Sequence, residues 1–480
     1  MLFLIGEEVL GPAFLPVFMR ELDIESEKSA WSFANTVLTL QFILLAVVTC
    51  GLCLAPSLAV NLLTHWSPES SPEKYALATQ SVRTLGPAVI GLSLGSTTYV
   101  LLNSYKRFFL AAFGDAVWKF AVVFFLVTGA VLARDNAQML MWGLVAGSLC
   151  KVGTHLFGLR DKLRQFRPEL AFSHPAFKRF CWLALPLLAG ILMAKVRDEV
   201  NNVYLLSALD QSGLMQANSM GRKLQSTLLF LIPYTLSIAA FPFFCELVDK
   251  NDHQKLGELV TRFGRMLLSV FAPFALFVAV AAVPFTSLIF RGGHFDAVAV
   301  QRTAVSLACY TFVLPAAAIE ALVMQAFFAN RRMLAVTLIG ILFSSISILI
   351  SWIGLKVSGG HELLLLAFIA GGFTLSRAFK CVTLVEMLKK NAPVFPFVET
   401  TAFMLRVGLA AGLASAAGWM LLRHVPVIAD QHGRMGDLIK LSVSGAAFGL
   451  IYLVAAYVLR INEVRELFAL AWRKVRKQQA

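Results

Sequence analysis

The densest set of side chains able to do chemistry is a run of charges inside an apolar stretch. Residues 195–202 read Lys-Val-Arg-Asp-Glu-Val-Asn-Asn and lie within the apolar segment 181–208. A charged group at the centre of a membrane helix costs about 2.5–3.5 kcal/mol on insertion scales, so such groups usually face a partner or a water-filled cavity. Because successive residues are rotated by about 100° around a helix, the run cannot face one side only. We therefore expect a wet interior beside this helix, lined by Lys195, Arg197, Asp198 and Glu199.

More ionisable residues are expected at the same cavity. Arg222 and Lys223 lie near the start of the apolar segment 219–245, and Glu7 and Glu8 lie near the beginning of the chain. Arginine suits a diphosphate because its planar guanidinium donates paired hydrogen bonds to phosphate oxygens. These charges favour a partly cationic central cavity that holds an anionic head group. The alternative is that the charges of the first run neutralise one another as structural ion pairs.

Other polar residues at membrane depth are weaker candidates. Glu320 lies in the middle of segment 303–328 and is a candidate for cation coupling, together with Asn201. A buried glutamate that is protonated or hydrogen-bonded is an equal alternative for Glu320. A coupling cation of unknown identity is therefore the only cofactor considered. Basic residues nearer the segment ends are interpreted as reaching to the interface, namely Lys119, Lys151, Arg377 and Arg406.

Two motifs that indicate catalysis or metal binding in other proteins do not do so here, because the surrounding sequence does not fit. Gly91-Leu-Ser93-Leu-Gly95 fits the G-x-S-x-G pattern, but a nucleophile elbow needs a strand-to-helix turn, and this pattern lies in an apolar helix. Cys50 and Cys53 have a ligand-like spacing without a histidine or acidic companion. Glycines spaced for close helix packing recur in two later segments, Gly143 with Gly147 and Gly408 with Gly412. No enzyme activity is expected.

The elements that carry these residues must be membrane helices. The 480 residues are 58% hydrophobic and 15% charged, and the mean hydropathy is +0.73. About 20 apolar residues span the hydrocarbon layer as a helix, and a backbone without water to bond favours helices. We expect an all-α polytopic membrane protein of about thirteen spans, over 2–19, 33–63, 84–104, 109–132, 137–159, 181–208, 219–245, 265–290, 303–328, 333–355, 362–386, 402–422 and 438–459.

The net charge of +14 is explained by topology and not by nucleic-acid binding. Lysine and arginine gather in every second loop, at 106–107, 160–179, 250–265, 331–332, 389–390 and 473–477. The positive-inside rule places these loops and the C-terminus in the cytoplasm. The same charges attract the anionic head groups of membrane lipids.

An internal repeat organises the chain. Prolines and basic loop residues recur at offsets of 226, 228 and 225 residues, in the pairs Pro16 and Pro242, Pro56 and Pro284, and Arg107 and Arg332. The repeat predicts two six-helix lobes of the same orientation, followed by two further helices, with the functional site between the lobes. The chain begins inside the helix that should be second, so the first lobe is expected to lack its first helix. The expected divisions are 1–159, a linker at 160–180, 181–390 and 391–480.

Four motifs together resemble one family. Residues 7–18 resemble an acidic residue followed by Ala-Phe-x-Pro-x-Phe, and residues 103–108 resemble Asn-x-x-x-Arg-Phe. Residues 290–296 resemble a Phe-x-x-Gly-x-Phe-Asp loop, and residues 326–329 resemble Ala-Phe-Tyr-Ala. Over nearly the whole chain, the sequence resembles the MurJ/MviN lipid II flippases of the multidrug/oligosaccharidyl-lipid/polysaccharide exporter superfamily.

The resemblance implies fourteen helices and a cationic central cavity for the head of lipid II, with a groove for the polyprenyl tail beside 402–422 and 438–459. It implies transport from the inner to the outer leaflet of the bacterial cytoplasmic membrane by alternating access, without ATP. The essential basic residue of the family's eighth helix matches Arg222. The expected partners are lipid II and membrane lipids, and a monomer is expected.

The chain departs from the family pattern at several positions. The first helix with its arginines is absent, the acidic residue expected before the helix-eight arginine is Gly221, and the next acidic position is Gln225. Three alternatives therefore stay open. The chain could export another polyprenyl-linked saccharide or a small drug-like cation, act as a membrane glycosyltransferase, or serve as a scaffold that transports nothing.

Overall fold

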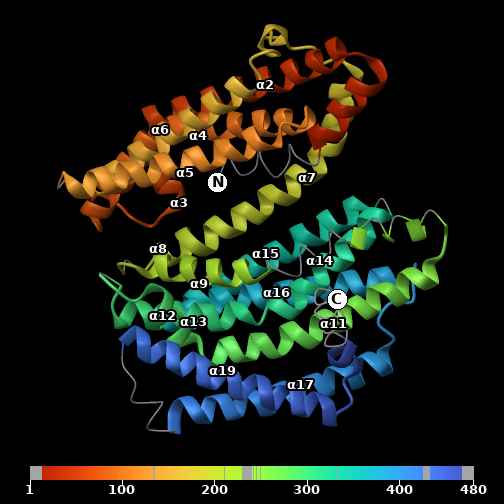
Figure 1. Ribbon diagram of the computed structural model, residues 1–480. Helices are drawn as coiled ribbons and strands as arrows, with labels where there is room; N and C mark the ends of the chain where they lie inside the picture. Colours follow the sequence, from red (N-terminus) through yellow and green to blue (C-terminus); the bar gives the residue numbers. More distant parts are fainter. Residues whose placement is uncertain are drawn as a thin grey trace, which may run out of the picture. The chain divides into compact units, whose positions relative to one another are not determined.

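The described part of the chain is helical (Figure 1). A computed structural model describes residues 13–132, 136–209, 211–229, 240–241, 243–244, 246–248, 250–293, 295–330, 332–424 and 433–466. Within these ranges the only β-type pairing is an isolated bridge between Gly292 and Phe295. Ten helices there are long and apolar enough to cross a membrane, and a bent pair adds an eleventh span. The all-α membrane fold is thereby confirmed. The spans expected over 2–19 and 219–245 lie partly or largely outside the described residues.

Two compact units divide the chain, Met1–Glu199 and Val200–Ala480. The division falls within segment 181–208, which the sequence predicted to be one helix. α7 (Pro175–Glu199) ends there, and a π-helical turn, η3 (Val200–Tyr204), begins the second unit. The division into lobes and a linker, which rests on the repeat, stays a prediction.

Proline breaks the first expected span of the first unit. α2 (Glu27–Leu54) begins at Ser26, whose side chain accepts a hydrogen bond from the backbone N–H of Ser29. α3 (Pro56–Leu63) follows after a single residue, Ala55, which has non-helical φ and ψ of −130° and 59°. Proline has no N–H and disfavours the helical conformation in the residue before it. Segment 33–63 is therefore two helices and not one.

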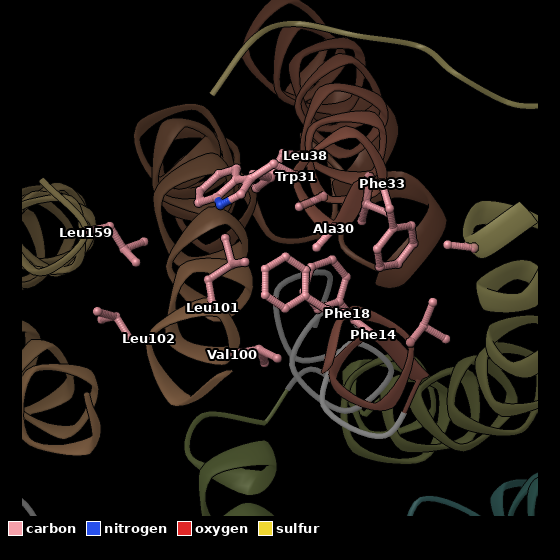
Figure 2. Close-up of a cluster of buried hydrophobic side chains, with 14 of the residues drawn as sticks. Phe14, Phe18, Ala30, Trp31, Phe33, Leu38, Val100, Leu101, Leu102 and Leu159 are labelled. Carbon is pink, nitrogen blue, oxygen red and sulfur yellow. The ribbon is translucent and has the colours of Figure 1, made fainter. Parts of the chain in front are cut away.

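The remaining helices of the first unit pack around an aromatic core. α4 (Pro72–Ser104) contacts α2, α3, α5 (Phe108–Val131) and α6 (Asn136–Gly158), and α5 pairs with α6. In the core, the ring centroids of Phe14 and Phe18 are 5.5 Å apart and those of Phe14 and Phe33 are 5.0 Å apart. Figure 2 shows these rings, with Trp31 and Leu101 in the same cluster. This core fixes the end of α2 that is discussed below.

The second unit continues from η3 through a longer series of helices. They are α8 (Leu205–Ser207), α9 (Leu214–Leu229), α11 (His253–Val280), α12 (Ala282–Phe290), α13 (Ala297–Thr311), α14 (Leu314–Ala329), α15 (Met333–Val357), α16 (Glu362–Lys389), α17 (Phe397–His424) and α19 (Gly433–Val458). Among them, α13 packs on α9 and α16, α14 lies against α11 and α16, and α17 pairs with α11 and α19.

The helix breaks follow the repeat. The 28-residue α2 is followed by the 8-residue α3, and the 28-residue α11 is followed by the 9-residue α12, so each break lies close to the repeated proline. The next helix differs between the copies. α4 runs on through Pro87, whereas α13 and α14 are separated at Phe312 and Val313 and bent by 45°.

Candidate functional site

In the second unit, a group of charged side chains lies within candidate membrane spans, and α16 supplies two of them, Arg377 and Lys380. Phe373, Arg377 and Lys380 are four and three residues apart and therefore share one face of the helix. Arg377 Nε donates to Glu320 Oε2 at 2.6 Å, and Lys380 Nζ lies 2.7 Å from Glu320 Oε1. Glu320, on α14, is only 2% exposed. One carboxylate thus holds two cations between two helices.

Arg222 joins this group through an aromatic ring. Its guanidinium carbon lies 5.0 Å from the centroid of the Phe373 ring, and the guanidinium carbon of Arg377 lies 5.8 Å from the same centroid. A cation over an aromatic face gains about 0.5–2 kcal/mol, more when it is removed from water. Phe373 is itself 4% exposed and packs edge-on against Tyr310. Both guanidinium groups therefore contact the same aromatic ring.

The glycine before Arg222 sets how closely α9 approaches α13. A Cβ at position 221 would lie 2.8 Å from the backbone nitrogen of Leu307 and 2.9 Å from Ser306 Cβ. No side chain fits there without moving α13. Gly221 and Gln225, where the family pattern has acidic residues, are both buried, and a carboxylate at 221 would have no space.

Glu320 is stabilised by its two partners. A buried carboxylate without a partner costs several kcal/mol, and good ion-pair geometry is needed to offset that cost. Within the group of Arg377, Lys380 and Glu320, two cations are paired with one carboxylate. An anion can bind next to such a group because positive potential in a low-dielectric setting attracts it strongly. The chemistry favoured here is recognition of phosphate, not bond breaking.

The charged run of the first unit lies at the C-terminal end of α7. Arg197 donates to Asp198 Oδ1 from Nε at 2.9 Å and from Nη2 at 2.6 Å, and the two side chains are 16% and 23% exposed. This pairing fits the alternative in which the run contains structural ion pairs. Lys195 and Glu199 are half-buried on the same turns. Whether these four residues line a cavity stays a prediction.

A polar patch surrounds the π-helical turn that follows. Asn201 is 3% exposed and its Nδ2 donates to Ser347 Oγ at 3.4 Å, while its Oδ1 has no hydrogen-bond partner in the described part of the chain. Asn218 Nδ2 donates to Asn202 Oδ1 at 2.5 Å. π-turns inside helices often mark functional positions. Asn201 thus keeps an oxygen available to a cation, as the coupling prediction requires.

Three further predicted site residues are Lys223, Glu7 and Glu8. Lys223 is exposed on α9. Glu7 and Glu8 lie outside the described residues. Among those that are described, no three histidine, cysteine, aspartate or glutamate side chains gather as a metal site would require. The six described cysteines, Cys50 and Cys53 included, form no disulfide.

Two basic residues assigned to the membrane interface instead form ion pairs with carboxylates of neighbouring helices. Arg377 pairs with Glu320, and Lys151 of α6 pairs with Asp115 of α5 at 2.6 Å with its own side chain 6% exposed. The interpretation that these residues reach to the interface was wrong. A signal was present for Lys151, because Ser148, Lys151 and His155 follow helical spacing as a polar stripe. Nothing in the sequence around Arg377 showed which helix supplied its partner.

The glycine patterns behave differently from one another. A Cβ on Gly91 would lie 2.5 Å from Ser148 Oγ, and one on Gly147 would lie 2.7 Å from the Trp118 ring. Both glycines therefore permit close helix contacts, as predicted. A Cβ on Gly408 or Gly412 would meet nothing within 4 Å in the described part of the chain. The prediction of close packing at these two positions was wrong.

Comparison with known proteins places the chain in one family. The sequence profile described as lipid II flippase MurJ matches residues 1–430. The lipid II flippase MurJ of Burkholderia cenocepacia is 24% identical over 68% of this chain, a match that spans 63% of that relative. The probable lipid II flippase MurJ of Bdellovibrio bacteriovorus is 22% identical over 96% of this chain and 86% of its own length.

Solved structures agree on the fold. A lipid II flippase MurJ in an inward closed conformation matches with a TM-score of 0.73 at 15% identity, covering 96% of this chain and 90% of the other. An inward-facing multidrug resistance transporter of the MATE family, in the MOP superfamily, matches with a TM-score of 0.67 at 12% identity, covering 81% and 88%. At these identities the likeness concerns the fold alone.

Proposed function

The chain belongs to the MurJ family of lipid II flippases, and from that premise we propose that it carries lipid II across the bacterial cytoplasmic membrane. The protein is a multi-span membrane transporter and not an enzyme. Transport runs from the inner to the outer leaflet by alternating access, and it supplies precursor for the peptidoglycan cell wall. A membrane glycosyltransferase or a scaffold that transports nothing would not explain a match to the flippase family over residues 1–430.

The observation that carries the proposal is the group of charges around Phe373. Arg222 and Arg377 lie at one ring, and Glu320 holds Arg377 and Lys380. Two guanidinium groups near one another suit a diphosphate because each can donate a pair of hydrogen bonds to phosphate oxygens. We assign the diphosphate of the head group to Arg222 and Arg377. The contribution of Arg197, Lys195, Asp198 and Glu199 belongs to the same proposal.

A coupling cation, of unassigned identity, forms part of the proposed cycle. Glu320 already has two cationic partners, which leaves little capacity for a third. The Oδ1 of Asn201, which has no hydrogen-bond partner among the described residues and lies close to Ser347, is the better oxygen ligand. Hard cations favour such amide and hydroxyl oxygens.

The positions of the basic loops support a cytoplasmic C-terminus, by the positive-inside rule. We propose a monomer as the working unit.

Depletion in the native host tests the proposal. When the chain is depleted, lipid II should lose its accessibility to reagents applied outside the cytoplasmic membrane and accumulate on the inner side. Re-expression of the wild-type chain should restore the outer pool. Normal outer accessibility in depleted cells would refute the proposal. If another polyprenyl-linked saccharide lost its accessibility instead, that glycan would replace lipid II as the substrate.

A further inference from the structure

A second anion-attracting site lies in the first unit, away from the residues assigned above. A cleft of about 790 Å³ opens between the first turns of α2 and the loop that joins α6 to α7. Its lining includes Lys28 and Asn35 from α2, and Arg164 and Arg167 from the loop. Glu27 begins a candidate membrane span. The cleft therefore lies near the end of the spans, where lipid head groups are found.

The loop is fixed to α2 by a series of hydrogen bonds. Asn35 Nδ2 donates to the backbone oxygen of Gln165 at 3.0 Å, and Ser32 Oγ donates to Glu169 Oε1 at 3.0 Å. The backbone nitrogen of Glu169 donates to Thr39 Oγ1 at 3.2 Å. A binding site whose walls are already held in place avoids the entropy cost of ordering them when a ligand binds. The cleft is preorganised in this sense.

The carboxylates in the cleft have partners, but the cations do not. Glu27 pairs with Lys162 at 2.6 Å and accepts from the Tyr105 hydroxyl at 2.9 Å, and Glu169 accepts from Ser32. In the part of the chain that the structure describes, no ion pair or hydrogen bond involves the side chains of Lys28, Arg164 or Arg167. Lys28, Arg164 and Arg167 outnumber Glu169, the one lining carboxylate without a cationic partner among the described residues, so the cleft attracts an anion, and arginine favours phosphate.

A buried amide oxygen adds a second requirement. Asn35 lines the cleft and is 3% exposed, and its buried Oδ1 has no hydrogen-bond partner among the described residues. A buried acceptor left unsatisfied costs about 1–3 kcal/mol, so a ligand gains affinity if its binding turns this amide towards the cleft and it donates a hydrogen bond to Oδ1. Phosphate oxygens without a proton cannot donate. The ligand should therefore carry hydroxyl or amide groups together with its phosphate.

We propose that this cleft binds a phosphate ester that also carries hydroxyl groups. The phosphate lies against Arg164, Arg167 and Lys28, and a hydroxyl donates to Asn35 Oδ1. Two sources share this chemistry, the sugar phosphate of a lipid-linked glycan and the glycerol phosphate of a membrane lipid. The site does not depend on transport of lipid II, and its failure would leave the proposed function intact.

Binding of a soluble probe to the full-length chain tests the proposal first. The chain is placed in phosphatidylcholine nanodiscs, and N-acetylglucosamine 1-phosphate is titrated calorimetrically. Replacing two phosphate contacts in Arg164→Gln with Arg167→Gln should weaken binding by about tenfold or more. Asn35→Leu should remove the preference for the sugar phosphate over inorganic phosphate. Lys119→Gln, at an exposed position on α5, is the control and should bind as the wild type does.

A second arm distinguishes the two sources. Native mass spectrometry counts the phosphatidylglycerol molecules retained by the wild type and by the Arg164→Gln, Arg167→Gln variant. Loss of a retained lipid together with no binding of the soluble probe assigns the site to a membrane lipid. Binding of the probe with unchanged lipid retention assigns it to a sugar phosphate. If neither ligand depends on these arginines, the proposal is overturned.

Discussion

Each half of the chain contains an ion-paired cation at the same sequence offset, but the surroundings of the two cations differ. Lys151 on α6 and Arg377 on α16 are 226 residues apart, the offset that also relates Pro16 to Pro242. Lys151 meets the single carboxylate of Asp115. Arg377 shares Glu320 with Lys380 and lies at the Phe373 ring with Arg222.

The difference separates an ion pair that serves helix packing from a charged group that we propose binds the substrate. In the first half, one cation and one carboxylate neutralise each other, and a Cβ on Gly95 would lie 3.1 Å from the Lys151 side chain. The pair therefore acts in packing α4, α5 and α6. In the second half, two cations meet one carboxylate, and a third cation is added by α9. The excess positive charge is what a bound diphosphate would neutralise.

Replacing every member of each ion-paired group should separate structure from function most clearly. Lys151→Met with Asp115→Leu should leave lipid II transport within about twofold, because a buried ion pair and a packed apolar pair often have similar stability. Arg377→Met and Lys380→Met with Glu320→Leu, which leaves neither cation of this group without its carboxylate, should abolish transport while the protein still accumulates. Complementation of a depleted strain, with membrane abundance measured in parallel, checks both. Equal loss in the two combined variants would break the comparison.

Removing only the carboxylate should destabilise the second half more than the first. Glu320→Leu leaves the Arg377 and Lys380 side chains without their shared carboxylate, which should lower the stability by about 3–5 kcal/mol. Asp115→Leu leaves only Lys151 without its carboxylate, and Asp115 is 33% exposed, so the loss of stability should be smaller. Thermal unfolding of the purified variants in detergent measures the order. A lower melting temperature for Asp115→Leu than for Glu320→Leu would contradict the burial argument.

Helix packing in the first half should be sensitive to a single methyl group. Gly91→Ala places a Cβ against Ser148 of α6, and overpacking of this kind costs about 1–3 kcal/mol. Gly408→Ala in α17 is the matched control, because a Cβ there meets nothing within 4 Å in the described structure. The change in unfolding temperature should be clear for Gly91→Ala and near zero for Gly408→Ala. Similar shifts would show that the glycine contacts do not govern packing.

The smallest effect is expected at the surface of the first half. Arg107 donates to both carboxylate oxygens of Asp161 at 2.5 and 2.7 Å, which lowers the pKa of Asp161 from 3.8 to about 2. A lowered pKa means that the pair stabilises the fold above pH 3.8 and that this contribution is lost as the pH falls towards 2. Asp161→Asn should reduce the melting temperature slightly at pH 7 and by much less at pH 2, where the carboxyl group of the folded chain is about half protonated. A difference of the same size at both pH values would exclude this cause.

Much of the fold follows from the sequence, because long apolar segments and loop charges depend only on local composition. The helix breaks at Pro56 and near Pro315 were visible as prolines, but Pro87 shows that proline alone does not decide a break. Arg222 was singled out in advance. Its proximity to Arg377 could not be predicted, since it depends on how α9, α14 and α16 pack. The same holds for the pairing of Lys151 with Asp115 across two helices.

Equilibrium binding of lipid II to the purified chain in nanodiscs tests the central claim most directly. Arg222→Ala should weaken binding by about tenfold or more, because a charge-assisted contact to phosphate is lost. Lys119→Ala should bind as the wild type does, at equal protein stability. Unchanged affinity in the Arg222→Ala variant would contradict the assignment of the diphosphate to the charges around Phe373.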